Sequence, residues 1–345
     1  MKERKMIIVT GGTGYIGSHT TVELLEKGYE VLIIDNLSNS KKEVIDNIEK
    51  ITGKRPLFEQ INLKDKEKTR TVFQKYSNAK AVIHFAAFKA VGESVENPLK
   101  YYENNLVSLI NVLEGMKEFG IPNLVFSSSC TVYGEPDKLP VDENAPIKKA
   151  NSPYGNTKQI SEEIIQDTIT AHKGLNGISL RYFNPIGAHE SALIGELPLG
   201  IPDNLVPYIT QTAIGLREQL RVFGNDYNTP DGTCIRDYIH VVDLAKAHII
   251  AIERLITREN NTDFEIFNLG TGNGNTVLEV VKTFEKVNQL QVNYKIVGRR
   301  PGDIEKVYAD ATIANSILKW KAEKSLADAL QSAWKWEQKY RNKTK

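Results

Sequence analysis

Short apolar runs alternate with longer stretches of helical spacing along the first half of the chain. Runs such as Ile7-Ile8-Val9 and Val31-Leu32-Ile33-Ile34 are apolar at every position, which is typical of strands buried on both faces of a parallel sheet. Because right-handed crossovers join such strands, the pattern predicts an α/β fold with a doubly wound, Rossmann-type parallel sheet. The predicted strands are Met6–Thr10, Glu30–Ile34, Pro56–Gln60, Ala81–Phe85, Leu124–Ser127 and Gly177–Arg181.

The pattern changes after Asn184, because Pro and Gly become frequent between Pro185 and Pro230. We therefore expect a smaller C-terminal lobe after the sheet domain. Ile235–Val241 has the pattern of a further strand and precedes a predicted helix, so we expect the chain to return briefly to the first domain. The predicted domains are 1–184 with 235–260, and 185–234 with 261–345.

The charges nearly cancel, since 44 Lys and Arg face 43 Asp and Glu. A net charge of +1 gives no global field that attracts nucleic acid or an anionic membrane, and no apolar run approaches the roughly 20 residues of a membrane helix. Cys130 and Cys234 are too few for a disulfide framework, which fits a reducing cytoplasm, and the start of the chain lacks the apolar core of a signal peptide. No His, Asp, Glu or Cys group has metal-ligand spacing, so we expect no metal.

A glycine-rich turn follows the first predicted strand and opens a helix. In this arrangement Gly11 allows a tight turn, Gly14 lets backbone N–H groups approach a pyrophosphate, and Gly17 lets helix and strand pack closely. Asp35 ends the second predicted strand, where a carboxylate hydrogen-bonds ribose hydroxyls and repels a 2′-phosphate. The pattern therefore predicts a dinucleotide site that prefers NAD to NADP, and the alternative is an ordinary glycine-rich turn.

Tyr154 and Lys158 stand four residues apart at a predicted helix start, with Ser152 as cap and Pro153 in the first turn. This spacing places both side chains on one helix face. A phenol has a pKa of about 10, but a nearby ammonium favours the phenolate, and Ser129 can share the proton of a substrate hydroxyl. We predict Tyr154 as the catalytic base, with Lys158 and Ser129 assisting. The alternative is a surface Tyr–Lys pair beside a serine loop.

Other features are expected to be structural. Tyr76 and Lys80 share the four-residue spacing but precede the fourth predicted strand, away from the serine run. His84 ends a strand among apolar neighbours and is expected to be a core histidine. Gly270–Gly274 lacks the spacing of the first glycine turn and is expected to form a helix-entry loop.

Longer stretches carry a resemblance that covers nearly the whole chain. They are Thr10–Gly17, Asp35-Asn36-Leu37, His84–Ser94, Ser127–Gly134, Tyr154–Lys158, Arg181–Pro185 and Arg236–Val241. Through them the chain resembles the extended short-chain dehydrogenase/reductases and, among these, the UDP-glucose 4-epimerase family.

The resemblance implies two sets of binding residues. Those for NAD would be Gly11, Gly14, Tyr15, Ile16, Gly17, Asp35, Asn36, Asn62, Leu63, Phe85, Ala86, Lys89, Asn104, Tyr154, Lys158 and, beside the nicotinamide, Phe183. Those for a UDP-sugar would be Lys89, Ser129, Tyr154, Asn184, Asn204, Leu205, Phe223, Arg236, Tyr238, Arg300, Asp303 and Val307.

The resemblance also implies a reaction. Tyr154 would remove the proton of the hydroxyl at sugar carbon 4 while hydride passes to NAD, and the 4-keto sugar would turn before hydride returns to its opposite face. UDP-glucose and UDP-galactose would interconvert, with the smaller lobe holding the UDP-sugar. A homodimer is implied as well, through a helix bundle formed near Pro98–Phe119 and Asn156–His172.

Val307 occupies a position where strict hexose epimerases resemble one another in having tyrosine. The smaller side chain predicts room for an N-acetyl group, so that UDP-GlcNAc and UDP-GalNAc would also interconvert. The alternative is that neighbouring side chains refill the space. Asn62 stands where the family often has Asp near the adenine, and its amide can still hydrogen-bond.

Two other functions compete with epimerisation. A nucleotide-sugar 4,6-dehydratase of this family has an Asp-Glu pair after a threonine near the catalytic serine, whereas this chain has Ser129-Cys130-Thr131. A non-catalytic NAD-sensing protein could keep the glycine turn without Tyr154 or Lys158, but both are present. A simple alcohol dehydrogenase would not need the second lobe.

Overall fold

The computed structural model describes residues 5–300 and 303–343. By its contacts the chain divides into two compact units, each built from several segments. Unit 1 comprises Met1–Gly134, Pro146–Arg181 and Ala245–Phe267, and unit 2 comprises Glu135–Ala145, Tyr182–Leu244 and Asn268–Lys345.

This division differs in its boundaries from the domains expected from sequence. The segment that returns to unit 1 is Ala245–Phe267 rather than 235–260, because the strand at Ile235–His240 pairs with strands of unit 2. Glu135–Ala145 leaves unit 1 because Val141 bridges to Ala309 and its carbonyl accepts a 2.9 Å hydrogen bond from Asn268 Nδ2. Apolar patterning shows that a segment is buried but does not show its partner.

Unit 1 is built on the predicted doubly wound sheet. Its seven strands lie in the order β10-β6-β5-β4-β1-β2-β3, and the order reverses between β1 and β4. Across the sheet, the neighbouring strands β6, β5, β4, β1, β2 and β3 pair in parallel, as the continuous apolar runs predicted. The strands are β1 (Met6–Thr10), β2 (Glu30–Ile34), β3 (Leu57–Glu59), β4 (Ala81–His84), β5 (Asn123–Ser127), β6 (Asn176–Tyr182) and β10 (Phe264–Leu269).

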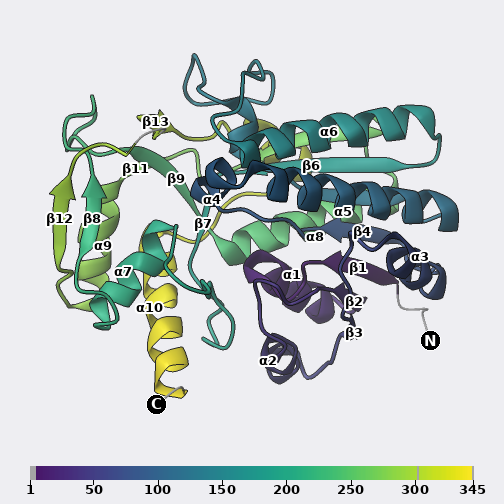
Figure 1. Cartoon of the computed structure of the whole chain (residues 1–345), viewed down its shortest axis with the longest axis horizontal. Helices are drawn as coiled ribbons and strands as arrows, with labels where there is room; N and C mark the ends of the chain where they lie inside the picture. The colour runs from purple at the N-terminus through teal and green to yellow at the C-terminus, as the bar shows by residue number, and fades with distance from the viewer. Residues whose placement is uncertain (1–4, 301–302, 344–345) are drawn as a thin grey trace. The chain divides into compact units, whose positions relative to one another are not determined.

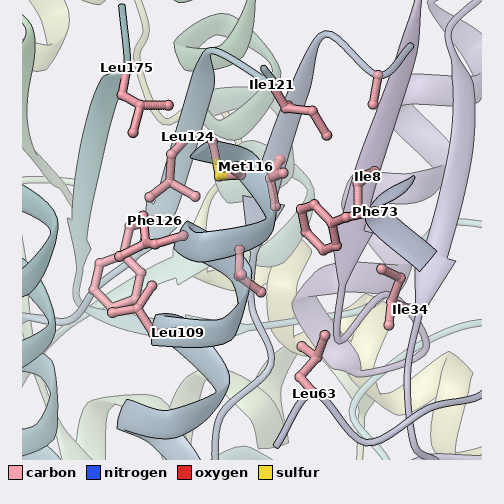
Figure 2. Packing of buried hydrophobic residues seen from close by; sticks show 14 of the residues in the cluster. Ile8, Ile34, Leu63, Phe73, Leu109, Met116, Ile121, Leu124, Phe126 and Leu175 are labelled. Carbon is pink, nitrogen blue, oxygen red and sulfur yellow. The ribbon is translucent and has the colours of Figure 1, made fainter. Parts of the chain in front are cut away.

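Helices cover this sheet (Figure 1). They are α1 (Tyr15–Glu26), α2 (Glu43–Thr52), α3 (Lys66–Lys75), α4 (Val91–Glu96), α5 (Pro98–Phe119), the 3-10 turn η1 (Cys130–Tyr133), α6 (Pro153–Ala171) and α8 (Val241–Thr257). On one face, Ile8 and Phe126 of the sheet pack with Phe73 of α3, Met116 of α5 and Ile165 of α6 in one apolar cluster, part of which Figure 2 shows. Leu63, a predicted NAD-binding residue, has its side chain in this cluster.

Local sequence signals set the ends of the helices that matter most for the site. Ser152 caps α6, since its hydroxyl accepts a 3.1 Å hydrogen bond from the Gly155 N–H, and Pro153 occupies the first turn as predicted. Pro98 begins α5, and Gly120 ends it with a φ of +69°, a left-handed conformation that glycine adopts without strain. The start of α6, where Tyr154 and Lys158 lie, is therefore fixed by its own sequence.

Unit 2 is arranged around β9 (Ile235–His240), which pairs with β7 (Asn184–Ile186), β11 (Gly274–Thr276) and β13 (Lys306–Val307). A separate two-stranded sheet joins β8 (Leu220–Phe223) to β12 (Tyr294–Val297). Apolar residues of β8 and β9 pack with the helices into one core. The helical elements are α7 (Leu205–Ala213), α9 (Val277–Asn288), the π-helical turn η2 (Ala314–Leu318) and α10 (Leu326–Lys343).

Within residues 5–300 and 303–343, no helix combines the length and the apolar character that crossing a bilayer requires.

Packing between α3 and α5 gives a stability prediction. A Cβ at Gly115 would lie 2.7 Å from Phe73 Cγ, so Gly115→Ala forces the buried ring to move. Alanine gains about 1 kcal/mol of helix propensity, whereas overpacking costs about 1–3 kcal/mol. We expect a net loss of about 1 kcal/mol in the free energy of unfolding, measured by urea denaturation followed by circular dichroism.

Gly92→Ala is the matched control, because Gly92 is also helical and no atom lies within 4 Å of the added Cβ. This variant should keep or slightly raise the wild-type stability. A Gly115→Ala chain as stable as the Gly92→Ala chain would show that the ring is not constrained.

Candidate active site

The glycine turn of unit 1 leaves no room for side chains. Gly11 has a φ of +70°, and a Cβ there would lie 2.8 Å from the Ala86 backbone nitrogen. A Cβ at Gly17 would collide with the Gly11 carbonyl oxygen. Gly14 is the N-cap of α1, where no side chain caps the helix, so the first-turn N–H groups point at an open helix end. These features fit the pyrophosphate of a dinucleotide, and Phe85 and Ala86 follow β4 beside the turn.

Asp35 follows β2 next to this turn. Its carboxylate accepts hydrogen bonds from the N–H groups of Thr13, at 3.2 Å, and Leu37, at 2.9 Å. The Ser40 hydroxyl lies 3.4 Å from the same carboxylate. These donors orient the carboxylate while leaving lone pairs for ribose hydroxyls.

The remaining predicted NAD residues of unit 1 lie on α1, on α5 and in loops that follow strands. Lys89 Nζ lies 6.0 Å from the centre of the Tyr15 ring, and Ile16 follows Tyr15 in α1. Asn104 Nδ2 donates to Asn105 Oδ1. Asn36 Oδ1 accepts from the Ser38 N–H, and Asn62 Oδ1 accepts from the Lys64 N–H, so these two amides shape their own loops.

Lys158 is a buried ammonium on the first turns of α6. Its Nζ donates a 2.7 Å hydrogen bond to the Ser127 carbonyl at the end of β5 and lies 4.7 Å from the centre of the Phe126 ring. The Tyr154 ring centre is 5.9 Å from the same nitrogen. Burial lowers the pKa of Lys158 to about 8, and the charge of Glu162 acts in the opposite direction. The cation is thus desolvated and close to the Tyr154 ring, and a nearby positive charge favours a phenolate.

Ser129 and His84 complete this region. Ser129 is buried and caps η1, since its hydroxyl accepts from the Thr131 N–H at 3.2 Å. His84 is buried, with its Nδ1 2.8 Å from the Thr10 hydroxyl, and burial followed by the Lys158 charge lowers the pKa of its imidazole to about 3. His84 is therefore a neutral core histidine, as the sequence predicted.

Glu162, one turn after Lys158, was missed by the sequence analysis. Its carboxylate accepts from the hydroxyls of Ser128, at 2.6 Å, and Ser179, at 2.7 Å. It also accepts from Arg181, whose Nη2 lies 2.6 Å away. The continuation of the four-residue spacing from Tyr154 through Lys158 to Glu162 was the available signal.

Strand pairing in unit 2 collects predicted UDP-sugar residues around β9. Asn184 on β7 pairs with Tyr238, and Val307 on β13 pairs with Arg236. Burial raises the pKa of Tyr238 above its usual value, so its phenol stays protonated. Phe183 is buried and precedes β7 directly.

Two arginines of unit 2 share one carboxylate. Arg236 Nη2 lies 3.9 Å from Asp303 Oδ1, and Arg300 Nη2 lies 2.6 Å from the same oxygen. The Arg300 guanidinium is 5.6 Å from the centre of the Phe223 ring. This group places two cations and an aromatic face together, which suits a nucleoside diphosphate. Asn204 and Leu205, two other predicted UDP-sugar residues, lie at the start of α7. Asn204 Nδ2 donates to Glu196 there.

Asp237 is a second residue that the sequence analysis missed. Its fully buried carboxylate accepts from the N–H groups of Thr271, Gly272 and Ala309 and from the Thr271 hydroxyl. Gly270–Gly274 is therefore not a simple helix-entry loop, because it folds around this carboxylate and continues as β11 before α9 begins. The loop and β13 are thereby tied to the strand that carries Arg236.

In the described part of the chain, no group of three or more His, Cys, Asp and Glu side chains could hold a metal ion.

Known proteins resemble the chain along nearly its whole length. A family model for GDP-mannose 4,6 dehydratase matches residues 8–333. A UDP-glucose 4-epimerase of Bacillus subtilis (strain 168) is 51% identical over 331 residues, or 96% of each chain.

Two solved structures extend this comparison. A UDP-glucose-4-epimerase from Stenotrophomonas maltophila with bound NAD and formylated UDP-arabinopyranose is 45% identical, with a TM-score of 0.95, over 99% of this chain and 100% of that chain. The UDP-Glc/GlcNAc 4-epimerase from Campylobacter jejuni is 35% identical, with a TM-score of 0.84, over 97% of this chain and 99% of that chain. The chain therefore belongs to the extended short-chain dehydrogenase/reductases and, within them, to the UDP-glucose 4-epimerase family.

Proposed function

We propose that the chain is an NAD-dependent epimerase that interconverts UDP-glucose and UDP-galactose through a 4-keto sugar. The observation that carries this proposal is the buried Lys158 ammonium beside Tyr154, at the carboxyl end of β5 in the unit that also holds the glycine turn. Binding at the carboxyl ends of the strands, where the strand order reverses, is the rule for open α/β sheets.

The glycine turn and Asp35 would hold NAD. Gly11, Gly14 and Gly17 let the diphosphate approach the N-terminus of α1, and the Asp35 carboxylate would accept from the adenosine ribose hydroxyls. NAD, when bound, supplies the acceptor that takes hydride from sugar carbon 4 and later returns it.

Tyr154 would move the proton. Its phenolate oxygen takes the proton of the C4 hydroxyl as the C4–H bond breaks, leaving a C4 carbonyl, and gives the proton back when that carbonyl is reduced. Lys158 favours the phenolate by its charge, and the Ser129 hydroxyl donates to the reacting sugar oxygen. Because hydride leaves and returns within one turnover, no second substrate is consumed.

The residues around β9 would hold the UDP moiety while the sugar turns. Arg236 and Arg300 carry the charge that pairs with the diphosphate, and Asp303 keeps the two guanidinium groups oriented beforehand. Phe223 offers an aromatic face beside Arg300. Anchoring through the nucleotide leaves the hexose free to present either face for hydride return.

Dehydration is the competing activity, since the matching family model is described as a dehydratase. Elimination of water needs an additional acid and base near the sugar. The η1 segment, Cys130-Thr131-Val132-Tyr133, follows Ser129 and contains no carboxylate. The residues beside the catalytic serine therefore favour epimerisation over elimination.

The first test incubates purified chain with UDP-galactose and follows the C4 epimers by proton NMR, with and without added NAD. We expect UDP-glucose to accumulate to an equilibrium mixture without net oxidation. Formation of a 4-keto-6-deoxy sugar would establish a dehydratase instead. No conversion of UDP-galactose in the presence of NAD would favour the NAD-sensing alternative.

Matched tyrosine variants show whether Tyr154 carries the reaction. Tyr154→Phe removes only the phenolic oxygen and should lower kcat by about 100-fold or more. Tyr76→Phe removes an equivalent oxygen from the other Tyr–Lys pair, where the hydroxyl donates to Glu59, and should leave kcat unchanged.

We also propose that the site accepts N-acetylated sugars, as the name of the Campylobacter jejuni protein states for that relative. Val307 is paired with Arg236, so its side chain belongs to the strand next to the predicted diphosphate anchor. Tyrosine at this position would add a ring where the acetamido group is expected.

Val307→Tyr should therefore abolish conversion of UDP-GalNAc while UDP-galactose conversion persists at a similar rate. Both reactions are followed by proton NMR under identical conditions. Loss of both activities together would mean that Val307 supports the fold or the UDP anchor rather than sugar size selection.

A homodimer is the proposed assembly. Large apolar side chains on α4 and α5 are exposed in the single chain, among them Val95 at 61% and Leu99 at 80%. We expect a dimer by analytical ultracentrifugation and a shift to monomer in Leu99→Asp. Leu216→Asp, at an exposed apolar residue of unit 2, is the control that should stay dimeric. A wild-type chain that stays monomeric at micromolar concentration would refute the assembly.

The proposed location is the cytoplasm, supported by Cys130 and Cys234, neither of which forms a disulfide in the described structure. Cell fractionation that recovers the chain in an oxidising compartment would contradict it.

A further inference from the structure

Glu162 of unit 1 carries a buried carboxylate one helical turn after Lys158, the second residue of the proposed catalytic pair Tyr154 and Lys158. Glu162 follows Lys158 by four residues on α6, so both side chains are on the same helix face. Glu162 is 7% exposed, and each of its oxygens is engaged. Oε1 accepts from the hydroxyls of Ser128 and Ser179 and from Arg181 Nε, and Oε2 accepts from Nε and Nη2 of Arg181.

The hydrogen bond to Ser128 connects Glu162 to the reacting groups. Ser128 lies between Ser127, whose carbonyl accepts from Lys158, and Ser129, the predicted proton-sharing hydroxyl. The Ser128 backbone N–H is held as well, at 3.0 Å from the Leu180 carbonyl of β6. Ser128 is thus held twice, by its hydroxyl on Glu162 and by its backbone N–H on β6.

Charge balance gives Glu162 a second role. Lys158 and Arg181 are both buried cations, and the structure gives Arg181 Glu162 as its ion-pair partner. The other groups around Lys158 do not supply negative charge: His84 of β4 is neutral, Tyr154 is the phenol to be activated, and Tyr133 of η1 lies over Arg181. On the helices packed against α6, Glu93 of α4 is bound to Lys100 and Tyr101, and Asn105 of α5 donates to Thr157.

We propose that Glu162 is a positioning residue for the reaction: its carboxylate fixes the Ser127–Ser129 segment and keeps the Lys158 ammonium charged beside Tyr154. This inference rests on the proposed function, because Lys158 has this task only if Tyr154 is the base. Glu162 itself touches neither sugar nor cofactor in this scheme.

The sign of the effect follows from the two opposing influences on Lys158. Burial lowers the pKa of its ammonium to about 8, and Glu162 raises it. Loss of the carboxylate therefore lowers that pKa further, and loss of Arg181 strengthens the field of the carboxylate and raises it. If activity needs the ammonium, kcat falls at high pH as Lys158 loses its proton. The alkaline limb of the plot of kcat against pH should therefore move with the pKa of Lys158.

The experiment measures kcat for UDP-galactose with NAD and substrate in excess, from about pH 6 to pH 10. In Glu162→Gln the alkaline limb should move down by about one pH unit, and in Arg181→Met it should move up. In the double variant Glu162→Gln/Arg181→Met, the pH of the alkaline limb should lie between that of Glu162→Gln and that of the wild type. If Glu162→Gln does not fold, the Arg181→Met variant tests the proposal alone: an alkaline limb at higher pH supports the role of Glu162, and an unchanged or lower one contradicts it.

Glu265→Gln is the matched control. Glu265 also forms a buried bidentate pair, with Arg254 at 2.7 and 2.9 Å, and it lies in the same unit. This variant should lose stability without moving the alkaline limb.

The outcomes separate this inference from the proposed function. An inactive wild-type chain contradicts the epimerase itself. An active wild type whose alkaline limb stays at the same pH in Arg181→Met and in every folded Glu162 variant overturns only the role of Glu162, even if kcat falls with the folded fraction.

Discussion

A buried ammonium at the end of β5 ties the start of α6 to the central sheet of unit 1. Bringing the pKa of Lys158 from its usual value to about 8 corresponds to a cost of about 3 kcal/mol for the charged form. This cost is what remains after stabilisation of the ammonium by the Ser127 carbonyl, the face of the Phe126 ring and the charge of Glu162. Each of these groups requires α6 to begin at one place relative to β5. The capping of α6 by Ser152 therefore helps to set where Lys158 lies.

Unit 2 is organised by strand register and by one internal carboxylate. Strand register alone places Arg236 opposite Val307 and Tyr238 opposite Asn184. Asp237, between the two, is tied to the backbone of Thr271, Gly272 and Ala309, so β9 is anchored on both sides. The second glycine-rich loop thus surrounds an internal carboxylate, whereas the first begins a helix that no side chain caps.

Elements fixed by local patterning were predictable from the sequence. The six strands predicted in the first half of the chain are all present, because runs such as Ile7-Ile8-Val9 are buried on both faces of the sheet. The helix start at Tyr154 follows from Ser152 and Pro153. Long-range partners were not predictable: Val141 bridges to Ala309, and Asp237 binds a loop more than thirty residues away. Glu162 follows Lys158 by four residues, and Arg181 begins one of the family motifs. The sequence did not show, however, that the two side chains form a buried ion pair.

The order of the segments also bears on biosynthesis. Unit 1 needs Ala245–Phe267 to complete its sheet edge, while Glu135–Ala145 must leave it to join residues that follow Leu269. A ribosome that releases the chain from its N-terminus therefore cannot deliver a finished first unit until about three-quarters of the polypeptide has emerged. Until then the edge of β6 that later pairs with β10 has no strand partner, and such edges promote pairing with other chains.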